Sequence, residues 1–271
     1  MKRIQPMTYA YLQETESKAT VATAAQLRGI STEFPGIVDA LLRLPCFFQL
    51  APDETGFGPW AQLILTSAGH TAAAAFSLWN RAYYLESMFL VRHLVEVLAQ
   101  IRYYHSRRGA FLRHQRAAHE RAGGKLSEGA QAKHIGFAEI FGKVAPRFHK
   151  THYGALLSGM THGGFAALIM RFEFKGPNEP VKPTFGCIFS EDRAGIVASY
   201  LTLTMYGLIR AGLDLDPKVL GVADQETQAV VKRDVAWLGR SLQADWDEFP
   251  KKRDLLSACI NMIGWRPVQL A

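Results

Sequence analysis

The chain has 271 residues, of which 48% are hydrophobic and 20% are charged, a composition typical of folded globular proteins. So many apolar side chains can fill a large core, which excludes a disordered chain, a fibrous repeat and a disulfide-stapled miniprotein. Lysine and arginine total 31 against 24 acidic residues, and the net charge of +7 favours polyanionic partners.

Helical periodicity dominates the sequence, and the alternation typical of strands is nearly absent. Across Leu85–Tyr104, for example, apolar residues recur at steps of three and four. The predicted helices, in chain order, cover residues 8–28, 32–44, 59–122 with a break near 80–83, 127–143, 148–170, 191–212 and 225–247. Ser31 is the expected N-cap of the second helix, and the proline-rich stretch Arg171–Pro183 can hold a short hairpin.

These elements predict an all-α, single-domain bundle of about eight to ten helices, because no shift in composition marks a domain boundary. Residues 1–58 are expected to pack as N-terminal helices and a loop on a core bundle of residues 59–247. Residues 248–271 are expected to form a tail. The uncharged stretch 55–80 and the apolar stretch 194–209 are interpreted as buried helices and not as membrane spans.

Cysteine usage and the N-terminus indicate a cytoplasmic protein. Cys46, Cys187 and Cys259 form no Cys-x-x-Cys pair, so neither a disulfide framework nor a cysteine zinc site is expected. The first residues are not followed by the apolar segment that a secretory signal requires. The glycine motifs that cradle phosphates are missing as well, so we expect no cofactor.

Nine histidines are present, most of them between His93 and His162, and they raise the question of a metal site. Neither Glu-x-x-His nor His-Glu-x-x-His occurs. The pair His149-x-x-His152 places two imidazoles about one helical turn apart, but no carboxylate accompanies them. Exposed or capping histidines are therefore the favoured interpretation, and no metal site is predicted.

Two charged residues interrupt an apolar helix, because Arg92 and Glu96 lie four residues apart on one of its faces. Charges in such a context are costly unless they are paired, so they form either a structural ion pair or a functional polar pocket. Far downstream, Ser158 and His162 are also four apart, in a glycine-rich helix. We expect Arg92, Glu96 and His162 to converge in one pocket, with His162 as acid or base, Arg92 binding an anion and Glu96 orienting it.

The same two helices resemble a group of uncharacterised bacterial helical proteins. Their pattern is an Arg-x-Leu-x-Glu helix, here Arg92 to Glu96, and a later Leu-Ser-x-x-x-His-Gly helix, here Leu157 to Gly163. The resemblance covers roughly residues 60–215. It implies an α-helical bundle and gives almost no help with activity.

The basic stretch Arg102–Arg121 is similar to the signature of HEPN ribonucleases, in which histidine follows arginine after four to six residues. Two overlapping pairs fit, namely Arg108 with His114 and Arg113 with His119. The resemblance implies a helical toxin or antiviral effector that cuts RNA without metal in a cleft built by a homodimer. Histidine can move the 2′-hydroxyl proton while arginine stabilises the phosphorane charge. The alternative interpretation of this stretch is a solvated basic helix.

Aromatic residues interleave with these arginines, as base stacking on RNA would require. The leading hypothesis is therefore a HEPN-like ribonuclease that acts as a homodimer. Its expected catalytic residues are Arg92, Glu96, His162, Arg113 and His119, and its expected substrate contacts are Arg108, His114, Tyr104 and Ser158. The alternative is a non-enzymatic bundle that binds a small anionic ligand or a partner protein through the pocket of Arg92, Glu96 and His162.

Overall fold

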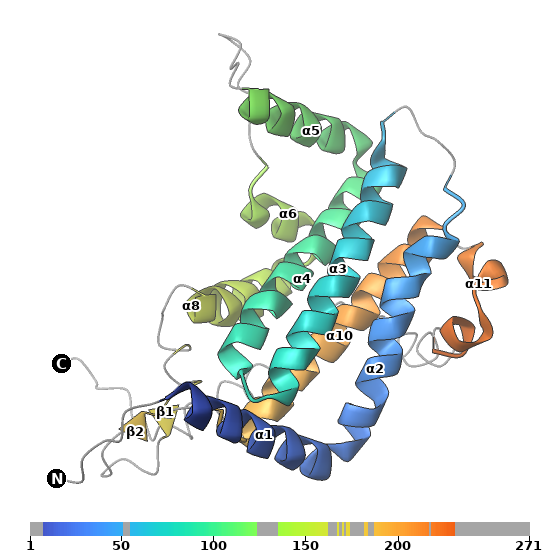
Figure 1. Ribbon diagram of the computed structural model, residues 1–271. Helices are drawn as coiled ribbons and strands as arrows, with labels where there is room; N and C mark the ends of the chain where they lie inside the picture. Colours follow the sequence, from blue (N-terminus) through green and yellow to red (C-terminus); the bar gives the residue numbers. More distant parts are fainter. Residues whose placement is uncertain are drawn as a thin grey trace, which may run out of the picture.

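A computed structural model describes residues 8–50, 55–123, 135–161, 167, 170, 172–173, 182–183, 187–216 and 218–230. These residues form an all-α, single-domain bundle, so the predicted fold class is confirmed (Figure 1). The helices are α1 (Tyr9–Gln26), α2 (Arg28–Arg43), the 3₁₀ turn η1 (Leu44–Phe47), α3 (Phe57–Asn80), α4 (Tyr84–Ser106), α5 (Arg108–Gly123), α6 (Phe137–Val144), α7 (Pro146–Phe148), the π-helix η2 (His149–Leu157), α8 (Ser158–Thr161), α10 (Glu191–Leu215) and α11 (Val219–Val222). The expected tail, 248–271, lies outside the described residues.

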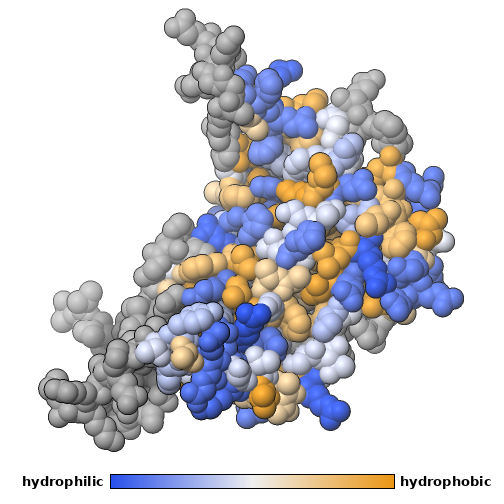
Figure 2. Space-filling view, in the orientation of Figure 1, coloured by the Kyte–Doolittle hydropathy of each residue, from blue (hydrophilic) through white to orange (hydrophobic). Residues whose placement is uncertain are grey.

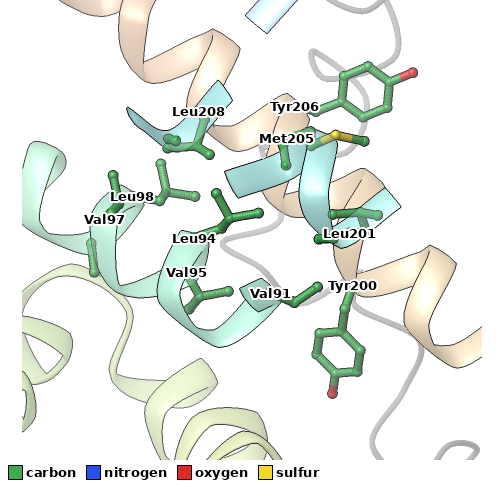
Figure 3. Packing of buried hydrophobic residues seen from close by; sticks show 14 of the residues in the cluster. Val91, Leu94, Val95, Val97, Leu98, Tyr200, Leu201, Met205, Tyr206 and Leu208 are labelled. Atoms are coloured by element: carbon green, nitrogen blue, oxygen red, sulfur yellow. The ribbon is translucent and has the colours of Figure 1, made fainter. Parts of the chain in front are cut away.

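The core lies between α3, α4 and α10, with α2 packed against α3 and α10. Aliphatic side chains of α4 interdigitate with those of α10, and all of them are fully buried or nearly so (Figure 3). Trp79 of α3 adds a buried hydrogen bond from its indole N–H to the carbonyl oxygen of Ala194, at 2.8 Å. Hydrophobic contact between these long helices therefore forms the core, and the shorter helices pack around it.

α10 is, within the described part of the chain, the helix that is long and apolar enough to cross a membrane. However, 78% of its most apolar window is buried inside the bundle. It packs against α4, α3 and α2. This burial is what the apolar sequence of a core helix requires.

The break expected near residues 80–83 is confirmed, because α3 ends at Asn80 and α4 begins at Tyr84. Ala82 takes the left-handed conformation there, with φ of 62°. The amide of Ala82 donates to the carbonyl of Trp79 and that of Tyr83 to the carbonyl of Leu78, which satisfies the end of α3. A second break, at Arg107, was not expected, and it turns α5 away from α4 (Figure 1).

Two predicted helices differ from the observed ones. α2 begins at Arg28, so Ser31 lies inside the helix and is not its N-cap. The amide of Ser31 already bonds to the carbonyl of Leu27, because α1 and α2 follow one another almost without interruption. In the second case Gly136 is not helical and α6 begins only at Phe137, while residues 124–134 lie outside the described part.

The segment after α6 contains both an expected and an unexpected element. The expected hairpin is present as β1 (Phe172–Glu173) and β2 (Lys182–Pro183), which pair antiparallel. The unexpected element is η2, a π-helix of nine residues between α7 and α8. Long π-helices are rare, and π-helical turns are frequent at functional sites. η2 packs against α4 and α6, which brings it beside the charged residues of α4.

Candidate functional site

Arg92 and Glu96 form an ion pair on α4, with Arg92 Nε 2.9 Å from Glu96 Oε1. Their side chains are only 20% and 15% exposed, so the pair lies at the boundary of the core. Mutual neutralisation is what makes this placement tolerable. The spacing of the two residues predicted this contact. The contact agrees with the interpretation of Arg92 and Glu96 as a structural ion pair.

Tyr153 of η2 completes the cluster, and no sequence pattern pointed to it. Its hydroxyl donates to Glu96 Oε1 at 2.5 Å and accepts from Arg92 Nη2 at 3.2 Å. The guanidinium carbon also lies 5.2 Å from the centroid of the Tyr153 ring, within cation–π range. Burial, followed by the hydrogen bond to Glu96, raises the pKa of Tyr153 to about 12. Tyr153 is therefore a neutral hydrogen-bond donor at physiological pH and not a nucleophile.

The expected third member of the pocket, His162, lies outside the described residues. Its convergence with Arg92 and Glu96 stays a prediction. Ser158 is the first residue of α8, which packs against α4, and its side chain is partly buried. The described cluster is thus Arg92, Glu96 and Tyr153, which we call the α4–η2 triad.

Aromatic rings hold Tyr153 in place. The ring centroid of Phe141 lies 4.4 Å from that of Tyr153, and His149 stacks on both rings at 5.7 and 5.8 Å. His152, in contrast, is buried against α10, where its Nδ1 lies 2.6 Å from the hydroxyl of Tyr200. The two histidines of His149-x-x-His152 therefore have different partners. Across the described ranges, no group of three or more potential ligands is placed to hold a metal ion.

The basic helix α5 has a buried face. The guanidinium of Arg108 lies 3.6 Å from the ring centroid of Phe57, and His114 packs 5.2 Å from the ring of Tyr104. Tyr104 and Phe111 are fully buried, in contact with Trp60. The interpretation of these aromatic residues as an exposed stacking surface is therefore wrong, because α5 lies across the end of the α3–α4 pair and covers them.

The opposite face of α5 is basic and open to solvent. Arg113, Arg116 and His119 are all exposed. Among the residues that the structure describes, none of the three forms an ion pair, whereas Arg43, Arg92 and Arg210 each do. We call these three residues the α5 basic face. His119 lies six positions after Arg113, which places the two residues about 9 Å apart along the helix axis.

Comparisons of the chain with protein-family models, with curated proteins and with solved structures find no match. The two resemblances read from the sequence therefore stay predictions. Function has to be argued from the α4–η2 triad and the α5 basic face themselves.

Proposed function

We propose that the chain is a metal-independent ribonuclease that holds the RNA backbone on the α5 basic face and cuts it with Arg113 and His119. The observation that supports this proposal is that Arg113 and Arg116 of α5 are exposed and form no ion pair with a carboxylate of the described residues. An unpaired cation is available to a phosphate, and its binding releases counterions from the RNA. Arg92 differs, because Glu96 already neutralises it.

The chemistry needs only the groups that this face offers. His119 removes the proton from a ribose 2′-hydroxyl, and the 2′-oxygen attacks the adjacent phosphorus. The bond from phosphorus to the 5′-oxygen breaks, and that oxygen takes up a proton from water, which leaves a 2′,3′-cyclic phosphate and a free 5′-hydroxyl, while His119 returns its proton to water. Arg113 stabilises the negative charge that develops on the phosphorane.

The packing of α5 distinguishes the two overlapping arginine–histidine pairs. Arg108 is stacked on Phe57 and His114 on Tyr104, so both are engaged in holding α5 to the bundle. Arg113 and His119 are exposed. We therefore assign the chemistry to the second pair and a structural role to the first.

The test is an assay of labelled single-stranded RNA with and without EDTA, using Arg113→Ala and His119→Ala. Both substitutions should abolish cleavage with helical content unchanged, and EDTA should have no effect. Arg28→Ala is the matched control, because Arg28 is an exposed arginine at the start of α2, far from α5 (Figure 1). It removes the same charge and should leave cleavage intact. Absence of cleavage by the wild-type chain, or cleavage that survives both α5 substitutions, would refute the proposal.

A second candidate function is binding of a small anionic ligand at the α4–η2 triad. The observation that favours it is that Arg92 keeps a fifth of its side chain exposed beside an unusual π-helix. A carboxylate or phosphate would have to compete with Glu96 for the guanidinium. Thermal-shift titration with inorganic phosphate and with acetate tests this, since Arg92→Ala should remove any stabilisation that the wild-type chain shows.

A further inference from the structure

An open, uncharged groove runs along the outer side of α3, with a volume of about 520 Å³. One helical stripe of α3 and one residue of α4 line it. The lining residues are Leu63, Thr66, Ser67, His70, Thr71, Ala74 and, from α4, Leu90. Figure 2 shows the side of the molecule drawn in Figure 1, on which apolar and weakly polar patches interrupt the hydrophilic surface.

The groove is more apolar than its composition indicates. The hydroxyl of Thr66 donates to the carbonyl of Gln62 at 2.9 Å, and that of Thr71 to the carbonyl of Ser67 at 3.1 Å. Both threonines therefore satisfy their polar groups within α3 and can present methyl groups. At one end Leu63 is 72% exposed, a large cost for a side chain with nothing to cover it.

The stripe is complementary to itself when a second copy is laid against it in the antiparallel direction. A two-fold axis passing between positions 68 and 69 pairs position 63 with 74, 66 with 71, and 67 with 70. Leu63 then meets Ala74 of the second copy, a large side chain against a small one. The other pairs are threonine with threonine, and a serine hydroxyl with an imidazole that can hydrogen-bond to it.

We infer that this groove is the contact surface of a homodimer, in which α3 of one copy packs antiparallel on α3 of the other. Leu63 of each copy inserts between Ala74 and Leu90 of its partner. Such a contact is isologous, with each residue pair occurring twice, as closed two-fold symmetry demands. Thr66, Ser67 and Thr71 in the middle of the stripe are small enough for the two helices to pack closely, while the larger His70 faces Ser67 of the second copy.

Charge supports a second copy as the occupant. Each chain carries +7, so most faces of two copies repel one another. The groove contains no lysine, arginine or carboxylate, and thus brings no like charges together. A strongly charged partner would find nothing to pair with there.

This inference is independent of the ribonuclease proposal, and it changes the expected dimer. α5 packs at the N-terminal end of α3, where Arg108 lies over Phe57. With α3 of 24 residues, about 36 Å long, the antiparallel contact places the two α5 helices at opposite ends. Each copy then presents its α5 basic face separately, and no shared cleft between the two α5 helices forms.

Sedimentation velocity of the full chain over a concentration series is the first test. The wild-type chain should dimerise, and Leu63→Glu should weaken the dimer about tenfold or more, because it places a charge in the apolar contact. Val21→Glu is the matched control, since Val21 of α1 is 71% exposed and lies outside the groove. It should leave the dimer unchanged. A monomeric wild-type chain, or equal effects of the two substitutions, would overturn the inference.

Disulfide trapping tests the antiparallel register. In a Cys46→Ser background, the double variant Leu63→Cys/Ala74→Cys should form a covalent dimer on mild oxidation. Leu63→Cys alone should not, because the two copies of position 63 would lie about 16 Å apart along the helices. Equal trapping by the single and double variants would contradict this register.

Discussion

Gly69 of α3 lies so close to Leu42 of α2 that a Cβ added to it would come within 2.8 Å of Leu42 Cδ2 and 3.2 Å of Leu42 Cα. Because one of these atoms belongs to the backbone, the two helices would have to separate. Gly69→Ala should lower the free energy of unfolding by about 1–3 kcal/mol. Gly195→Ala is the control, since open space surrounds Gly195 in α10, and it should raise stability by about 0.5–1 kcal/mol. Urea unfolding measures the free energy of unfolding of both variants. A Gly69→Ala variant as stable as the wild type would disprove the close contact.

The corner between α3 and α4 stores a small strain at Ala82, whose φ is 62°. Glycine adopts this conformation without the clash of a Cβ with the backbone. Ala82→Gly should therefore raise the free energy of unfolding by about 0.5–1 kcal/mol, against the usual trend for glycine. Thermal unfolding measures the effect. Ala73→Gly, inside α3, should do the opposite, and destabilisation by both substitutions would show that Ala82 is not strained.

Tyr153→Phe should destabilise the protein by about 1–3 kcal/mol. The substitution keeps the ring among its aromatic neighbours but removes one hydrogen bond from Glu96 and one from Arg92. Chemical denaturation at pH 7 measures the loss. Tyr9→Phe, at a position that is 74% exposed, is the control and should change stability by less than about 0.5 kcal/mol. If the two variants matched the wild type equally well, the α4–η2 triad would contribute nothing to the fold.

Alkaline pH should reveal the buried phenol of Tyr104. Burial is the main cause that raises its pKa from the ordinary value of 10.0 to about 12, and among the described residues its hydroxyl has no hydrogen-bond partner. Because the pKa is higher in the folded chain, the protonated Tyr104 makes its full contribution to the free energy of unfolding below pH 10, where the unfolded chain also keeps the proton. This contribution is lost as the pH rises towards 12. Relative to Tyr104→Phe, the wild-type chain should lose about 2–3 kcal/mol over this window.

At pH 7 the same substitution should leave stability unchanged or slightly higher, because it removes a polar group that bonds to nothing. Urea unfolding at pH 7, 9, 10.5 and 11.5 follows the difference between the two proteins. A difference that is constant across the series would mean that Tyr104 ionises normally.

The helices with strong apolar periodicity were predictable from the sequence, since periodicity reports which face of a helix is buried. The corner near Asn80–Tyr83 and the pairing of Arg92 with Glu96 followed from local spacing. The break at Arg107 did not, because α5 turns there in order to cover Phe57 and Tyr104, which belong to other helices. Contacts between residues that are distant in the sequence are not predictable from the local spacing of apolar and polar residues.

The candidate site shows the same limit. Tyr153 stands shortly before the pair of Ser158 and His162, yet its partners are 57 and 61 residues away. Its spacing of four residues from His149, on which it stacks, points to neither of these partners, and the π-helical winding of η2 was not expected either. The expected exposed aromatic surface was wrong for a related reason, because Tyr104 and Phe111 are covered through contacts with Trp60 of α3, which is distant from them in the sequence.

The nine residues of η2 behave as an insertion accommodated without a loop. A π-helix advances with more residues per turn than an α-helix, so the segments before and after it are out of phase with a continuous α-helix. An α-helix of the same nine residues would turn further than this π-helix does, because each of its residues turns through a larger angle. Ser158 and the rest of α8 would then be rotated away from the side on which α8 packs against α4, so the winding of this segment, as much as its residue types, determines what α8 presents to α4.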